Sequence, residues 1–458
     1  DFEKAKKQFV LARDLDTLRF RPDSKVNEVI RQVAEGRTGE GIYLVDALSL
    51  FEENSPHATP GKELFFEHVH LNFKGSYLLA QAVFDQVSEI LDVQVGEVER
   101  TDLLSETELS RRLAFTSYDV FRVTEELVRR LQKAPFTNQL YNDEQIKRIQ
   151  QNLETLRFYT TPKALEEQAR QYLEAIEKNP EDPWLRYNYA MLLEEFRKYG
   201  GMAEELKIVI HHLPQHVPAY EKLAKALISQ GKFGEAIAWC ETALKMKPDF
   251  VPVRLHMAYA FAKAGKLDES ITQYRAIMHH DPDLLPDIYN EIGRILLYQG
   301  KLQEAVDTYR EAIGFNERSP ARKPIPDVNF NFGYVLKKVG KAGEAYEQFF
   351  QAAEGYRKQL EVNPKKGETH AVLARTLLEM GDFEDAARHF REATVLNPMD
   401  PANHFNLIQT LKVQGNIEAA IAAAREAIKI MSENHQGEAG ETFQKELESL
   451  ISRRDNRR

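Results

Sequence analysis

The sequence predicts a mostly α-helical protein, in which a superhelix of helical hairpins follows a shorter segment of partial α/β character. Three observations predict this fold class. Glycines recur at intervals of 34 to 41 residues between 231 and 415, small and aromatic residues recur at fixed distances after them, and prolines recur at intervals of 34. A repeat of this length with these residue types is typical of a stack of two-helix units. The first 100 residues lack the pattern.

The recurring glycines set the register of the repeat. They are Gly231, Gly265, Gly300, Gly340, Gly381 and Gly415. A small residue follows five positions later and a larger one nine positions later, as in Ala386 and Phe390 after Gly381. Small residues let two antiparallel helices approach closely, and glycine allows the tight turn between them. Prolines such as Pro180 and Pro214 separate one hairpin from the next.

This pattern resembles the tetratricopeptide repeat (TPR) family, and the resemblance covers residues 141–434. It implies that each hairpin buries its apolar face only by stacking on its neighbours, which produces a curved superhelix. Arrays of this kind need a polar capping element at the end. We therefore expect a capping helix and a basic tail over residues 435–458.

Two further segments have helical patterns of their own. Residues 101–140 predict a helical connector, in which Thr116, Ser117 and Asp119 cap a helix. Within the array, 24 residues separate Gly340 from Pro364, whereas 17 separate Gly231 from Pro248. We therefore expect the second helix of that repeat to be seven residues longer than its counterparts.

The first 100 residues contain a short motif that resembles part of an active site. Residues 41–48 predict a buried strand and residues 76–91 an amphipathic helix. Between them lies "FFEHVHLNFKG", in which Glu67 precedes His70 by three residues. A carboxylate beside an imidazole is the arrangement that orients a general base toward a nucleophile.

Strand, loop, acidic residue, histidine, glycine and helix in this order resemble the last conserved block of SGNH (GDSL-like) hydrolases. The resemblance identifies residues 17–100 as the C-terminal part of such an α/β domain, with His70 as the base and Glu67 as its orienting acid. It also implies a serine nucleophile earlier in the sequence, but no serine in residues 1–64 lies in a Gly-Asp-Ser context. We therefore expect this chain to be inactive as a hydrolase.

The first residues repeat the pattern of a later hairpin. "DFEKAKKQFVLA" at the start matches "DFEDAARHFREA" at residues 382–393 in its Phe, Ala and aromatic positions. Residues 1–16 are therefore predicted to be half a TPR hairpin, and the chain a fragment cut within it. The combined resemblances imply an exported or membrane-anchored bacterial parent. A serine esterase or acyltransferase whose repeats recruit a substrate or partner stays open as the function of that parent.

Composition excludes several classes of function. The chain has 61 Lys and Arg against 71 Asp and Glu, a net charge of −10, which argues against nucleic-acid binding. No apolar run is long enough to span a membrane. The single Cys240 excludes an internal disulfide and a cysteine-based zinc site, and its position in the repeat predicts a buried structural thiol. His68 and His70 lack a visible third metal ligand, and no cofactor is expected.

The resemblance to TPR proteins implies that the first helix of each hairpin lines a concave groove. Six positions before each turn glycine, on these first helices, the chain has Lys225, Tyr259, Arg294, Tyr334, Arg375 and Gln409. Nearby positions add Asn290, Lys337 and Lys412. The second helices carry acids instead, namely Glu235, Glu269, Glu304 and Glu344. Basic and aromatic side chains along one groove suit a partner with carboxylates. Our hypothesis is a scaffold that binds an acidic or C-terminal peptide, against the alternative that exposed helix positions often hold Lys or Arg.

Overall fold

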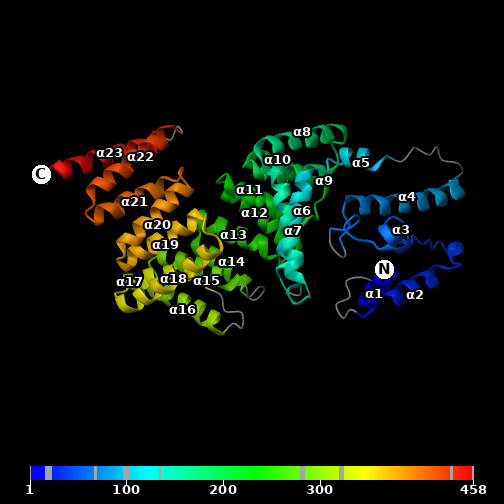
Figure 1. The fold of residues 1–458 in the computed structure, drawn as a ribbon, viewed down its shortest axis with the longest axis horizontal. Coiled ribbons are helices and arrows are strands. Elements are labelled where there is room, and N and C mark those ends of the chain that lie inside the picture. The colour runs from blue at the N-terminus through cyan, green and yellow to red at the C-terminus, as the bar shows by residue number, and fades with distance from the viewer. Residues whose placement is uncertain are drawn as a thin grey trace. The chain divides into compact units, whose positions relative to one another are not determined.

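The computed structural model divides the chain into two compact units, residues 1–219 and 220–458. Within the part of the chain that it describes, the secondary structure is helical, with 23 α-helices and one isolated β-bridge between Phe65 and Leu71 (Figure 1). The described residues are 2–15, 23–66, 70–95, 104–133, 136–139, 141–278, 284–318, 324–433 and 437–455. No described helix is long and apolar enough to cross a membrane.

The first unit contains ten helices and the start of an eleventh in its described residues. They are α1 (Phe2–Asp14), α2 (Ser24–Ala34), α3 (Ala47–Glu53), α4 (Phe73–Val95), α5 (Glu106–Arg112), α6 (Ser117–Leu131), α7 (Asn142–Leu156), α8 (Pro162–Lys178), α9 (Pro183–Glu195), α10 (Tyr199–His212) and α11 (Val217–Ser229). Short 3-10 helices lie at η1 (Thr38–Glu40), η2 (Pro56–Ala58), η3 (Phe136–Asn138) and η4 (Arg157–Thr160).

The strand expected over residues 41–48 is not found. Residues 42–46 form no ladder, so their backbone groups lack the partners that define a strand. Asp46 instead begins α3, accepting a hydrogen bond from the Ser49 amide at 3.2 Å, and pairs with Arg31 at 2.7 Å. The Arg31 guanidinium lowers the pKa of Asp46 to about 2. The α/β part of the predicted fold class is therefore wrong for the described residues of 17–100, which form helices and loops.

Helix α6 begins at the predicted cap. The Thr116 hydroxyl and the Asp119 carboxylate bond reciprocally to each other's backbone amides, which forms a capping box. The buried Asp119 also accepts a hydrogen bond from the Tyr172 hydroxyl of α8 at 2.6 Å. Tyr118 lies in one apolar cluster with Leu165, Tyr172 and other side chains of α8 and α9. The packed core around these helices therefore begins before residue 141.

The second unit continues α11 and then alternates first and second helices of successive hairpins (Figure 1). They are α12 (Phe233–Met246), α13 (Val251–Lys263), α14 (Leu267–Ile277), α15 (Leu285–Tyr298), α16 (Leu302–Arg318), α17 (Pro326–Lys338), α18 (Ala342–Val362), α19 (Gly367–Met380), α20 (Phe383–Leu396), α21 (Pro401–Val413), α22 (Ile417–Glu433) and α23 (Gly437–Asp455). From α12 to α23, helices that are consecutive in the chain pack on one another.

The periodic residues have the geometry that the sequence predicts. All six turn glycines have positive φ angles, between 73° and 83°, a region that favours glycine. The small residues five positions after each of these glycines are buried. Nine positions after a glycine, Cys240, Tyr309 and Phe390 are fully buried. Gly293 lies so close to Tyr309 that a Cβ there would be 2.4 Å from the ring. The aromatic ring therefore fills the space that the small residue leaves.

Helix lengths follow the spacing of the repeats. Helix α18 has 21 residues and α20 has 14, so the longer second helix is confirmed. Its apolar face continues through the added turns, where Ala353 and Tyr356 are buried. The last helix, α23, packs on α22 through the buried Phe443 and Leu450. It covers apolar side chains that the final hairpin would otherwise expose to water.

Candidate binding groove

A hollow of about 960 Å³ lies among the first helices of the second unit. Side chains of α13, α15, α17, α19 and α21 line it. Four of the predicted partner-binding residues contribute to it, namely Tyr259, Arg294, Tyr334 and Arg375. These residues are up to 116 positions apart in the sequence (375 − 259), and the stacking of hairpins brings them to one surface.

The cations of this hollow have different environments. Arg375 is exposed, and its guanidinium lies 5.2 Å from the centre of the Phe330 ring. Among the described residues it forms no ion pair. Arg294 is also exposed but pairs with Glu291, one turn earlier on α15, at 2.8 Å. An exposed pair of this kind contributes about 0–1 kcal/mol, so Glu291 can be displaced from Arg294 at little cost.

A second hollow of about 490 Å³ adjoins the first, and Arg294 and Arg375 line both. Asn290, another predicted residue, lines this second hollow and accepts a hydrogen bond from Asn331 at 2.8 Å. Acids lie here too. Burial, together with Asp327 and Glu291, raises the pKa of Asp287. The groove is therefore of mixed charge and less uniformly basic than the sequence indicates.

The other predicted partner-binding residues lie outside these two hollows. Lys337 pairs with Glu379 at 2.8 Å. Gln409 and Lys412 both contact the carboxylate of Glu446 on α23, at 3.2 Å and 2.8 Å. Lys225 lies on α11, a half-buried position that lines neither hollow. Together with Arg294, which pairs with Glu291, four of the nine predicted residues thus already contact a carboxylate of this chain.

The predicted catalytic pair is only half within the described residues. Glu67 lies outside them. His70 is exposed, and its carbonyl accepts a hydrogen bond from the Phe66 amide at 2.8 Å. At Gly75 a Cβ would lie 2.3 Å from the Leu64 carbonyl oxygen, so packing of the loop on α4 requires glycine there. The pairing of Glu67 with His70 stays a prediction.

Other chemistry finds no support in the described part of the chain. It contains no cluster of three or more His, Cys, Asp or Glu side chains suited to a metal ion. Cys240 is fully buried, and burial raises the pKa of its thiol to about 12. A thiol with so high a pKa is a poor nucleophile near neutral pH.

Four models of the tetratricopeptide repeat match the sequence. They cover residues 171–202, 203–249 together with 372–437, 227–290, and 286–318. The chain carries tetratricopeptide repeats. The matched residues contain α13, α15, α21 and the larger part of α19, and therefore most of the TPR first helices that line the larger hollow. These matches do not extend to residues 1–170, and they lend no support to a hydrolase domain.

Solved structures of TPR-like proteins are also similar to this chain. A tetratricopeptide repeat protein from Parabacteroides merdae has 15% identity and a TM-score of 0.40, covering 61% of this chain and 98% of its own. PilW, a type IV pilus biogenesis factor, has 21% identity and a TM-score of 0.38, covering 49% and 97%. PilF of Pseudomonas aeruginosa has 19% identity and a TM-score of 0.34, covering 50% and 97%. No curated protein sequence matches.

Sequence reasoning missed several side chains of the TPR groove. Phe330, Tyr298, Leu378 and Glu379 all line the larger hollow. The signal was available, because Phe330 occupies in its repeat the place that the predicted Asn290 occupies in the one before, ten residues ahead of the turn glycine. Tyr298 is 84% exposed and lies four residues after Arg294, on the same face of α15.

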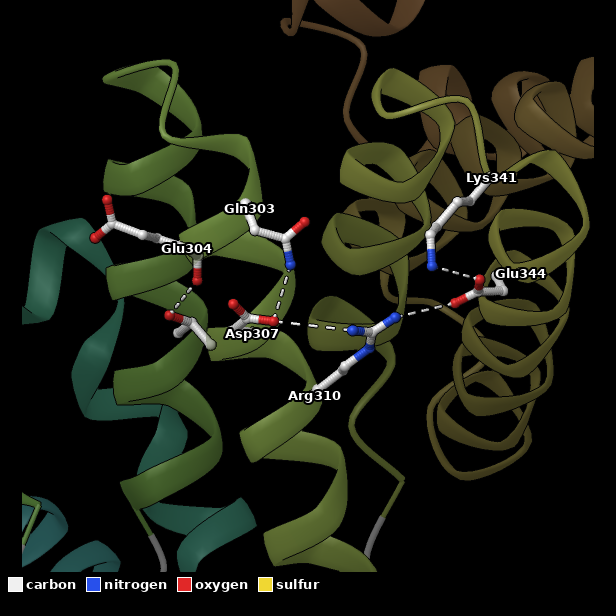
Figure 2. A network of polar contacts seen from close by, with 7 residues as sticks. Gln303, Glu304, Asp307, Arg310, Lys341 and Glu344 are labelled. Atoms are coloured by element: carbon white, nitrogen blue, oxygen red, sulfur yellow. Dashed lines mark hydrogen bonds and ion pairs between the residues drawn. The ribbon is translucent and has the colours of Figure 1, made fainter.

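The second helices of the TPR hairpins carry the predicted acids, and one of these, Glu344, is paired. Figure 2 shows Arg310 of α16 between Asp307, at 3.8 Å, and Glu344 of α18, at 3.4 Å. Lys341 contacts the same Glu344 carboxylate at 2.8 Å. The Glu304 carboxylate points away from this network. The acids therefore serve partly to join neighbouring repeats, and the surface of these helices is not simply acidic.

Proposed function

We propose that this chain is a protein-interaction scaffold whose TPR groove binds an acidic segment of a peptide or protein partner. TPR arrays expose long surfaces along which consecutive repeats present equivalent positions. A hollow of about 960 Å³ is within the size range of pockets that enclose a small ligand. It suits a few residues of a partner chain, with the neighbouring hairpins contacting the flanking residues.

Arg375 is the observation that carries the proposal. Its guanidinium lines a hollow formed by five helices, lies beside an aromatic ring and forms no ion pair among the described residues. A guanidinium can donate two parallel hydrogen bonds to a carboxylate, and such charge-assisted bonds are about twice as strong as neutral ones. The Phe330 ring, 5.2 Å from the guanidinium carbon, adds a cation–π contact on one side of it.

A carboxylate of this chain indicates which chemical group binds at the equivalent position of another repeat. Glu446 of α23 accepts hydrogen bonds from Gln409 and Lys412 of α21, the first helix of the final hairpin. Gln409 occupies in its repeat the place that Arg375 occupies in the repeat before, six residues ahead of the turn glycine. We infer that a partner's Asp or Glu, or a C-terminal carboxylate, makes the corresponding contact with Arg375. Tyr259 and Tyr334 then pack on its apolar neighbours.

The acids of the adjoining hollow restrict the ligand. Burial, and then the nearby Asp327 and Glu291, raise the pKa of Asp287, so a second carboxylate of the ligand would be repelled there. We therefore propose that any further acidic group of the partner docks on the side of Tyr259, where Lys263 lies 5.3 Å from the tyrosine ring. The esterase or acyltransferase alternative has no supporting observation in the described residues.

A peptide array tests the charge of the ligand. Twelve-residue peptides of graded net charge, each made with a free and with an amidated C-terminus, would be screened, and the affinity of the strongest binders measured by fluorescence anisotropy. We expect selection of peptides rich in Asp and Glu, with affinity that falls as salt rises. Arg294→Glu with Arg375→Glu should weaken binding by about tenfold or more, since hydrogen bonds between charged groups contribute about 1.5–3 kcal/mol each.

Arg391→Glu with Arg425→Glu provides the control. These two arginines are exposed on the second helices α20 and α22 and line neither hollow, and their replacement changes the net charge by the same amount. The control should bind the acidic peptides nearly as well as the parent. Selection of basic peptides, or equal losses in both double variants, would exclude the proposed groove.

A further inference from the structure

Two buried histidines face each other between α19 and α20. His370 and His389 are each 8% exposed, and their Nδ1 atoms are 2.9 Å apart. The other ring nitrogen of His370, Nε2, is 3.0 Å from the Pro364 carbonyl oxygen, which belongs to the end of the preceding hairpin. The pair therefore connects the two helices of one hairpin and the hairpin before it.

The same contact occurs in other repeats with different residues. A side chain on a first helix bonds to one on its second helix 19 residues later in Arg186 with Glu205, Arg254 with Gln273, and Asn329 with Gln348. Arg186 and Arg254 also donate to the carbonyl of the proline six residues earlier, as His370 does. Only His370 and His389, among these four pairs, place two imidazoles in the position.

The geometry determines where the ring protons lie. A carbonyl oxygen can only accept, so His370 carries its proton on Nε2 and its Nδ1 is an acceptor when the ring is neutral. His389 must then donate from Nδ1, the less common tautomer of a free imidazole. A proton added to His370 enters at Nδ1 and turns the acceptor into a second donor.

We infer that His370 and His389 form a latch between α19 and α20, closed when both rings are neutral and released as they take up protons. The first added proton leaves a charge among buried side chains, and a second places two N–H groups opposite each other. Release separates the two helices of a hairpin, and α19 is the helix that carries Arg375. The latch is a property of the hairpin itself and does not depend on which ligand the groove binds.

The surroundings of the pair oppose a positive charge. Burial lowers the pKa of His389 to about 4, helped by Arg388 on its own helix, by His370 on α19 and by Arg357 on α18, while Asp385 acts in the opposite direction. Arg388 and Arg357 are each paired, with Asp385 and Glu354. On α21, the buried His404 is bonded to the Pro398 carbonyl.

The sign of the pH effect follows from linkage. Because the pKa of His389 is lower in the folded hairpin than its ordinary value of 6.5, the open hairpin binds more protons in acid. The stabilisation is therefore complete above about pH 6.5 and is lost as the pH falls toward 4. For values of 6.5 and about 4, opening should rise about thirtyfold between pH 7.5 and pH 5.

Nitrogen-15 spectra of the histidine rings in the full chain test the protonation states directly. We expect the Nδ1–H tautomer at His389 and the Nε2–H tautomer at His370 at pH 7.5. His389 should remain neutral well below pH 6. Nε2–H tautomers on both rings, or titration of His389 near 6.5, would overturn the latch even if no variant were made.

Hydrogen exchange followed by mass spectrometry tests its effect on α19 and α20. The chain with His389→Gln keeps a partner for His370 that does not titrate, as Gln273 and Gln348 do in their repeats, so it should lose the pH-dependent rise in opening. Comparison at the same pH cancels the intrinsic change in exchange rate. His404→Gln is the control, since His404 bonds to a proline carbonyl but residue 423, which is 19 positions later, is alanine. The His404→Gln variant should keep the pH-dependent rise in opening. Loss of the rise in His404→Gln, or persistence of the rise in His389→Gln, would contradict the inference.

Discussion

Close contact between a glycine and an aromatic ring determines how two helices of a hairpin meet. Gly293 and Tyr309 are the tightest example, because a Cβ at Gly293 would lie 2.4 Å from the ring. Phe349 approaches Gly333 in the next hairpin in the same way. The spacing predicted that both positions recur, and the structure brings them together within one hairpin, where only a small residue can stand beside the ring.

Replacing that glycine should therefore separate the helices. Gly293→Ala is expected to lower the free energy of unfolding by about 1–3 kcal/mol, the usual cost of overpacking a core. Gly343→Ala is the comparison, because a Cβ there meets no atom within 4 Å and helix propensity favours alanine by about 0.5–1 kcal/mol. Urea unfolding followed by circular dichroism would measure both. Destabilisation by Gly343→Ala equal to that by Gly293→Ala would show that the contact is not the cause.

Capping decides where helices begin, and it distinguishes the predictions that succeeded from one that failed. Thr116 and Asp119 were predicted to cap a helix, and α6 begins there. Asp46 also caps a helix, α3, but the apolar residues before it resemble a strand when only their sequence is considered. A strand needs a neighbour to bond with, and the residues beside it in sequence cannot reveal whether one is present.

Loss of the cap should destabilise the first unit. Thr116→Ala removes the hydroxyl that accepts from the Asp119 amide and donates to its carboxylate, and we expect a loss of about 0.5–2 kcal/mol. Thr155→Ala removes a hydroxyl that bonds only within its own exposed helix, at the Asn152 carbonyl, and should change stability by less than about 0.5 kcal/mol. Thermal unfolding of both variants would be compared. A larger effect from Thr155→Ala would contradict the importance of the capping box.

A stack of hairpins is held together by contacts between neighbours. The apolar clusters follow the chain, with one around Tyr172, one around Tyr309 and one around Phe390. Each of these clusters contains side chains from only a few successive helices, so different parts of the stack need not unfold together.

The two tryptophans report on the units separately. Trp184 lies in the first unit and Trp239 in the second. Trp239→Phe leaves only Trp184 as a fluorescent reporter, and Trp184→Phe leaves only Trp239. We expect different urea midpoints for the two variants, with circular dichroism of the parent between them. Coincident transitions by all three probes would indicate one cooperative unit.

The sequence by itself determined the repeat, its register and the extra length of the second helix after Gly340, because these depend on residues close together in the chain. The spacing of Gly381, Ala386 and Phe390 predicts the geometry of one hairpin, independently of the other hairpins. Only the tertiary structure decided which charges of the groove are available. Lys412 and Lys337 looked equivalent to Arg375 in the sequence, yet Glu446 and Glu379 pair with them, from helices 34 and 42 residues away. Such pairing depends on how hairpins stack, and a local pattern contains no information about it.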